Sequence, residues 1–103
     1  MQAVLEVVAE PRRRQIMALL LERERLVGDL AAELHISQPA VSKHLRVMRD
    51  AGLVEARVDA QRRWYHLVGD PLAELDDWLQ PYRQFWEQRL DALAQHLDSM
   101  EDS

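Results

Sequence analysis

Apolar residues recur at helical spacing in the first part of the chain and predict two helices there. The first is a short apolar stretch over residues 3–8, and the second runs from Pro11, which is tolerated in a first turn, to about Glu24. Its first turn holds Arg12–Arg14, although the helix dipole favours acids at that end. These arginines therefore indicate either an external anion or a solvated basic patch paired with Glu10 or an acidic tail.

A third, short helix is expected over residues 27–34, with Leu30, Ala31 and Leu34 facing inward. The small side chain of Ala31 lets the next helix cross closely, as a helix-turn-helix requires. The chain must reverse directly afterwards. We expect His35 to end this helix in the left-handed conformation, in which histidine is one of the enriched non-glycine residues.

The fourth helix, over about residues 37–51, is amphipathic. Ser37 is its expected cap, and Val41, Leu45 and Met48 form one buried stripe at i, i+4 and i+7. On the other face, short polar groups come first and long cations follow: Gln38, Pro39, Ser42, Lys43, Arg46 and Arg49. This layout is typical of a recognition helix that enters the major groove, although taken alone it also fits an ordinary solvated helix.

Residues 53–67 alternate between apolar and polar positions on both sides of a short polar turn, which predicts a β-hairpin. Tyr65 and Leu67 share one face, and we expect both to pack on the core. Arg62 and Arg63 lie beside the tip, where a wing reaches a neighbouring minor groove or the DNA backbone.

The last helical region spans about residues 71–98. Pro81 interrupts it, and an internal proline costs about 3 kcal/mol, so we expect a kink or break near this residue. Its aromatic side chains exceed what a small core covers, which favours a homodimer interface, with a helix folded back on its own domain as the alternative. The expected interface residues are Val4, Leu5, Val8, Leu79, Tyr82, Trp86, Leu90, Leu93 and Leu97.

The composition supports one soluble domain without disulfides. The 103 residues are 48% hydrophobic and include no cysteine. No apolar run reaches the roughly 18 residues that span a bilayer, and the start lacks the order of a signal peptide. We therefore expect a single mainly α-helical domain over residues 1–103, located in the cytoplasm and without a membrane partner.

The net charge of −5 conceals a separation of charges along the chain. Residues 37–66 carry six Lys or Arg and three Asp or Glu, whereas residues 69–103 carry two Arg and nine Asp or Glu. Phosphates respond to charges within a Debye length, about 8–10 Å at ordinary salt, rather than to the total. The middle segment is therefore the candidate surface for double-stranded DNA.

The order of these elements, together with four motifs, resembles the ArsR/SmtB family of winged helix-turn-helix transcriptional regulators. The motifs are Pro11–Ile16, Ile36–Leu45, Met48–Val54 and Tyr65–Leu67, in that order. The resemblance covers nearly the whole chain. It implies a winged helix with a two-stranded hairpin, and a symmetric homodimer, held by the terminal helices, that binds an imperfect palindrome and represses transcription.

The resemblance also implies specific DNA contacts. In the recognition helix they correspond to Gln38, Ser42, Lys43 and His44, and in the wing to Arg62 and Arg63. By its helical angle, however, His44 lies beside the buried stripe. Its side chain is thus expected either to contact a phosphate or base, or to pack.

The chain departs from metal-sensing members of the family. Cysteines are absent from the helix before the recognition helix, and the last helix has His96 alone, with Asp91 and Glu101 off the needed spacing. We therefore expect a cysteine-free, non-metal branch with no cofactor, and no residue cluster identifies a small-molecule effector. The hairpin tip is Ala60–Gln61 in place of the usual glycine, which predicts a loop longer than two residues.

The sequence fits two other functional classes less well. An enzyme is disfavoured, because three scattered glycines build no phosphate loop and no Ser/His/Asp arrangement is present. The remaining alternative to a DNA-binding regulator is a winged-helix adaptor that binds protein through its aromatic tail.

Overall fold

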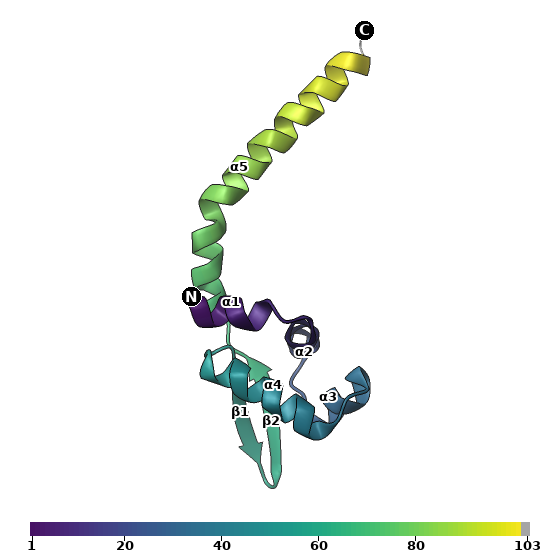
Figure 1. Cartoon of the computed structure of the whole chain (residues 1–103), viewed down its shortest axis with the longest axis vertical. Coiled ribbons are helices and arrows are strands. Elements are labelled where there is room, and N and C mark those ends of the chain that lie inside the picture. The colour runs from purple at the N-terminus through teal and green to yellow at the C-terminus, as the bar shows by residue number, and fades with distance from the viewer. Residues whose placement is uncertain (102–103) are drawn as a thin grey trace.

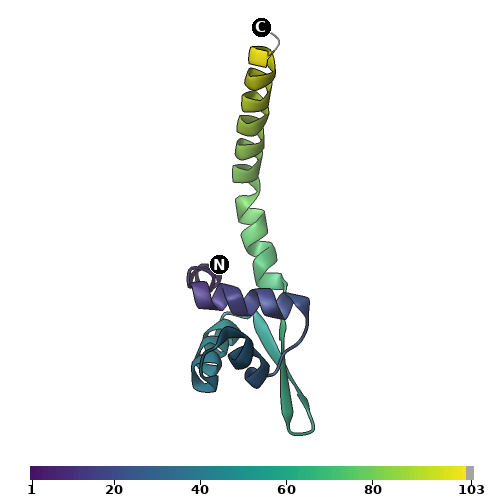
Figure 2. The same cartoon turned by 90° about the vertical axis from the view of Figure 1, so that its right-hand side faces the viewer.

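The computed structural model describes residues 1–101, which form five helices around a two-stranded antiparallel hairpin (Figure 1). Helices α1 to α4 and the hairpin make one body, and α5 extends away from it (Figures 1 and 2). The hairpin tip and the end of α5 lie at opposite ends of a 68 Å long axis. The elements are α1 Gln2–Val8, α2 Pro11–Glu22, α3 Val27–Leu34, α4 Gln38–Asp50, β1 Val54–Asp59, β2 Arg62–Leu67 and α5 Asp70–Glu101.

The core of the body is built around α4. Its stripe Val41, Leu45 and Met48 is fully buried, as the sequence predicted, and packs with Ile16 of α2 and Leu30 of α3. Each of these large side chains has at most 2% of its surface exposed. Removing a comparable buried side chain typically costs about 2–5 kcal/mol, so this stripe fixes which face of α4 points outward.

The turn between α3 and α4 has the predicted construction. His35 adopts φ 57° and ψ 42°, and the amide of Ile36 donates to the carbonyl of Ala31, 3.2 Å away. Ser37 then caps α4, with its Oγ accepting from the amide of Ala40 at 3.2 Å. The left-handed residue and the cap together reverse the chain within three residues, which sets the recognition helix across α3.

The hairpin loop is shorter than predicted. Asp59 pairs with Arg62, so Ala60 and Gln61 alone form a two-residue loop. Ala60 adopts a positive φ of 56°, which costs a non-glycine residue roughly 1–2 kcal/mol. Two-residue loops match the twist of the strands, and this fit outweighs the missing glycine. The buried Tyr65 and half-buried Leu67 pack against the core, as expected.

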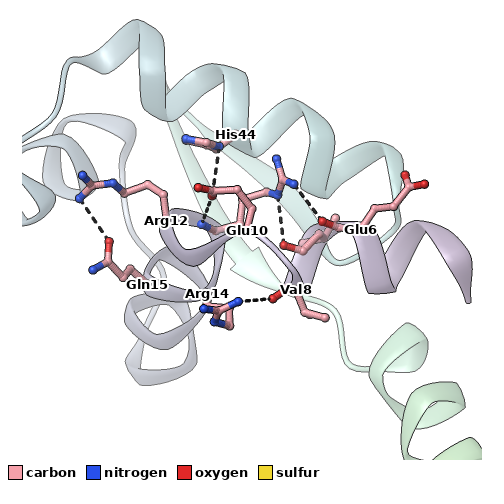
Figure 3. A network of polar contacts seen from close by, with 9 residues as sticks. Glu6, Val8, Glu10, Arg12, Arg14, Gln15 and His44 are labelled. Carbon is pink, nitrogen blue, oxygen red and sulfur yellow. Dashed lines mark hydrogen bonds and ion pairs between the residues drawn. The ribbon is translucent and has the colours of Figure 1, made fainter.

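Two of the three arginines in the first turn of α2, Arg13 and Arg14, have a structural role that neither sequence interpretation anticipated. Arg13 donates to the carbonyls of Glu6 and Val7 at 2.9 and 3.1 Å, and Arg14 donates to that of Val8 at 2.7 Å (Figure 3). These carbonyls belong to the last turn of α1, where the helix lacks internal partners. The arginines thus cap the end of α1 and join it to α2.

Helix α5 is continuous through Pro81, so of the predicted kink or break the structure has no break. Its axis does change direction in the first half of the helix, as expected for a kink (Figure 1). Arg83 donates to the backbone carbonyl of Asp76 at 3.0 Å and to Gln80 Oε1 at 3.0 Å, and it lies 2.6 Å from the Asp76 carboxylate. These charge-assisted contacts span the proline and hold the two halves in one helix.

The left-handed turn residue gives a stability prediction. Because glycine adopts this conformation without steric cost, His35→Gly should raise the free energy of unfolding by about 0.5–1 kcal/mol. Urea denaturation monitored by circular dichroism would measure the change. His35→Ala is the matched control and should give no gain, whereas equal stabilisation by both variants would contradict the conformational explanation.

The capping arginines give a second prediction. Arg13→Leu should lower the free energy of unfolding by about 1–2 kcal/mol, because two helix carbonyls lose a charged donor. Thermal unfolding would measure the loss, with the exposed Arg23→Leu as control. If Arg13→Leu left stability unchanged but weakened anion binding, the arginine would be serving an external anion instead.

Candidate nucleic-acid interface

The outward face of α4 is mainly polar, with Pro39 and the 38% exposed Val47 as its apolar side chains. Because the buried stripe fixes the rotation of the helix, the side chains on the opposite face are left in solvent. The hydrogen-bonding groups lie in the first turns, while Arg49 lies in the last turn, where a cation suits the helix dipole. Every predicted recognition-face residue is exposed: Gln38, Pro39, Ser42, Lys43, Arg46 and Arg49.

The wing extends this face. A hollow of about 380 Å³ separates α4 from the hairpin, and Ser42, Arg46, Arg49 and Arg63 contribute to its lining, with Asp50 as the single carboxylate. Three guanidinium groups around one hollow favour an anion such as a phosphate. The structure therefore brings Arg63 to the same surface as the helix arginines, which the hairpin register alone could not show.

Arg62 is exposed at the tip, opposite Asp59 in the ladder. A second hollow of about 420 Å³ continues along α4 and is lined by Pro39, Ser42, Lys43 and Arg46. The two hollows share Ser42 and Arg46, so they form one continuous surface from the start of α4 to the wing. A surface of this kind can follow a phosphate backbone while the first turn of α4 meets base edges.

His44 points away from this surface. Its ring is half-buried, and Nδ1 lies 4.0 Å from the Glu10 carboxylate at the start of α2 (Figure 3). Glu10 caps α2 by accepting the Arg13 amide at 2.8 Å, and this hydrogen bond, more than the nearby His44, lowers the pKa of the Glu10 carboxyl. Of the two roles considered for His44, the structure favours packing over a DNA contact.

Arg57 contributes little to the basic surface, although it belongs to the basic segment. Its guanidinium lies 2.7 Å from Glu24 and 3.9 Å from Asp59. The hydrogen bond from Arg57 lowers the pKa of the Glu24 carboxyl, and the same bond raises the pKa of Arg57. The positive charge of Arg57 is therefore already neutralised by Glu24 within the subunit.

Helix α5 presents a long apolar surface to solvent. None of its described residues is buried, and Trp86 and Leu90 are 55% and 64% exposed. The helix stands off the body, so the alternative in which it folds back on its own domain is wrong (Figure 2). Further exposed residues of this surface are Trp78, Tyr82, Phe85, Leu93 and Leu97.

The predicted interface needs one correction at its amino-terminal end. Val4 is only 3% exposed and belongs to the core of the subunit, because α1 turns Val4 and Val7 onto the body. Leu5, on the other side of α1, is 40% exposed, and Val8 and Leu79 are half-buried. Leu5, Val8 and Leu79 therefore retain exposed surface that a second subunit can contact, whereas Val4 does not.

Sequence reasoning missed Arg25. This residue is 2% exposed, and its guanidinium pairs with Glu22 and Glu33 while its backbone pairs with Tyr65. The surrounding run, Glu22 to Arg25, alternates in charge and reads as a solvated loop. No local pattern distinguishes Arg25 from its neighbours, because its partners Glu33 and Tyr65 come from α3 and the hairpin.

Within residues 1–101, no three His, Asp or Glu side chains are grouped as a metal site would require. Across the same residues, no helix is both long and apolar enough to cross a bilayer.

Comparison with known proteins agrees with this arrangement. Residues 10–56 match the family model described as bacterial regulatory protein, arsR family. An HTH-type transcriptional regulator of Mycobacterium tuberculosis is 39% identical over 97 residues, which cover 94% of this chain and 88% of that protein.

Other relatives share the winged-helix part. The biofilm growth-associated repressor of Agrobacterium fabrum is 39% identical over 70% of this chain, and the transcriptional activator HlyU of Vibrio cholerae is 44% identical over 62%. The matched residues span 62% and 59% of those two proteins.

A solved structure shares the architecture. It is the homodimeric winged helix-turn-helix DNA-binding domain of a possible ArsR-family regulator from Mycobacterium bovis. Its TM-score is 0.66 and its identity 31%, over 81% of this chain and 77% of that one. By sequence and by fold, the chain belongs to the arsR family of bacterial regulatory proteins.

Proposed function

We propose that the protein is a homodimeric repressor that binds an inverted-repeat operator through α4 and the wing. The observation that carries this proposal is the continuous basic surface from Lys43 to Arg63, formed on a helix whose other face is buried. In this proposal, Gln38 and Ser42 read base edges in the major groove. Ser37, Pro39, Lys43, Arg46, Arg49, Arg62 and Arg63 are assigned to backbone or groove contacts.

The exposed apolar surface of α5 supports the homodimer. An apolar surface of this extent on a monomer is typical of a protein–protein interface. Two subunits joined by α5 would place two α4 helices on one side of the dimer, related by a two-fold axis. Inverted half-sites about 34 Å apart match that symmetry.

Repression would follow from occlusion. A dimer bound over a promoter excludes other proteins from the same DNA, and this needs no further activity. The site of action would be the cytoplasm, where bacterial DNA is accessible.

Salt dependence distinguishes this proposal from a protein-binding adaptor. Each neutralised phosphate contributes a slope of about −0.9 to log K against log salt concentration, while an apolar protein interface responds weakly to salt. Fluorescence anisotropy with a labelled duplex at several salt concentrations provides the test. A steep negative slope supports DNA binding, and a flat response with weak binding would favour the adaptor.

Two substitutions in α4 should act differently. Lys43→Ala should weaken binding to all duplexes and reduce the magnitude of the salt slope by about 1, because one phosphate contact is lost. Gln38→Ala should instead relax the preference at one base position, at a cost of about 1–3 kcal/mol for the preferred base. Both residues are exposed, so both variants should fold, which circular dichroism checks.

The dimer assignment is tested at Trp86. Trp86→Glu should give monomers with poor operator binding, because a charge would be buried in the α5 interface. Sedimentation velocity would measure the assembly state. Arg23→Glu, a charge change on the exposed surface of the body, is the control and should remain dimeric. A Trp86→Glu protein that still sediments as a dimer would contradict the role of α5.

A further inference from the structure

The connection between α2 and α3 forms a rigid support at the base of the wing. The amide of Arg25 donates to the carbonyl of Tyr65 at 3.1 Å, and the amide of Tyr65 donates back at 2.9 Å, so Arg25 adds a one-residue strand to β2. The buried guanidinium of Arg25 pairs with Glu22 at the end of α2 and with Glu33 of α3. The segment is thus fixed to two helices and to the sheet.

Glu24, the preceding residue, joins this support to the other strand of the hairpin. Its Oε2 lies 2.7 Å from Nη2 of Arg57 on β1. Both side chains are partly exposed, at 39% and 50%, so the pair contributes little to overall stability. Its effect is local, because it connects a rigid segment to a hairpin that projects from the body.

Arg57 lies close to the tip of the hairpin, so its contact with Glu24 restrains the outer part of the wing. Arg57 pairs with Trp64, and beyond it lie only the pairs Val58–Arg63 and Asp59–Arg62 and the two-residue loop. Val58 is 67% exposed, so the outer hairpin has little packing to hold it. Across residues 1–101, the Glu24 contact is the polar tie between hairpin and body that lies nearest the tip.

We propose that Glu24 is a positioning residue for DNA binding: through Arg57, it holds the wing where Arg62 and Arg63 reach the same duplex as α4. Glu24 itself contacts no DNA in this arrangement. The inference rests on the proposed function, because it concerns how the wing engages DNA.

The sign of the effect separates positioning from simple electrostatics. Glu24→Gln removes a negative charge from a protein that binds a polyanion. A neutral amide oxygen also holds Arg57 more weakly than a carboxylate does and leaves the Arg57 charge uncompensated, able to attract phosphates. Electrostatics alone therefore predicts tighter binding. A positioning role predicts the opposite, because a wing free to pivot loses its ordered contacts.

The test is duplex binding by the full chain with Glu24→Gln. We expect the dissociation constant to rise about three- to tenfold, and the magnitude of the salt slope to fall by about 1–2 as wing phosphate contacts are lost. Glu55→Gln is the matched control. It also removes a carboxylate near the hairpin, but Glu55 pairs with His66 within the hairpin, 3.5 Å away, and its loss should leave binding unchanged or slightly tighter.

Two further variants make the test specific. In a background of Arg62→Ala and Arg63→Ala, adding Glu24→Gln should cost less than twofold, because the wing no longer has contacts to lose. Exchanging the charges, with Glu24→Arg and Arg57→Glu together, should bring binding back to within about threefold of the original chain.

The outcomes are distinguishable. If the original chain binds no duplex, the proposed function fails and this inference fails with it. If the original chain binds but Glu24→Gln binds as tightly or more tightly, the positioning role alone is overturned. An equal loss with and without the wing-tip arginines would also overturn it, because the effect would then not act through the wing.

Discussion

The burial of one stripe of α4 is the constraint on which the rest of the molecule depends. Val41, Leu45 and Met48 fill the centre of the body against α2 and α3, and their exclusion from water fixes the rotation of the helix. The polar face of α4 points outward because its apolar face is completely buried in the core. The cap at Ser37 and the turn at His35 determine where the helix starts, and hence which side chains occupy its first turn.

The same fold also determines which positively charged side chains are paired within the subunit and which are exposed to solvent. Several of the cations are already bound by groups of the same subunit and contribute little to a DNA-binding surface. Arg13 and Arg14 cap α1, Arg25 is buried between two glutamates, and Arg57 pairs with Glu24. The cations that remain unopposed are concentrated on α4 and the hairpin. An acidic protein can therefore present a basic surface, since what DNA meets is the local field and not the net charge.

Much of the architecture could be predicted from the sequence because it depends on local rules. Helical spacing, the serine cap, the left-handed histidine and the alternation in the hairpin are each contained in a few neighbouring residues. The exposed face of α4 followed from its stripe alone. The assignments to individual DNA contacts are still predictions, as are the residues of the dimer interface other than Val4.

The features that the sequence did not predict are contacts between distant segments of the chain. The capping role of Arg13 and Arg14 was not predicted, because their acceptors are carbonyls in the last turn of α1. Arg25 was missed because Glu33 and Tyr65 are remote in sequence, and Val4 was assigned to the interface because a short apolar helix does not show which side faces the body. At Pro81 the sequence left a kink or a break open, and the contacts of Arg83 with Asp76 across the proline, which accompany a continuous helix, were not predicted.

Selection of bound fragments from a random pool of duplex DNA by the purified protein tests the central claim most directly. We expect enrichment of an inverted repeat whose half-sites lie about one helical turn apart, because one dimer presents two α4 helices. Recovery of no common sequence, or of a single unpaired half-site bound by a monomer, would contradict it.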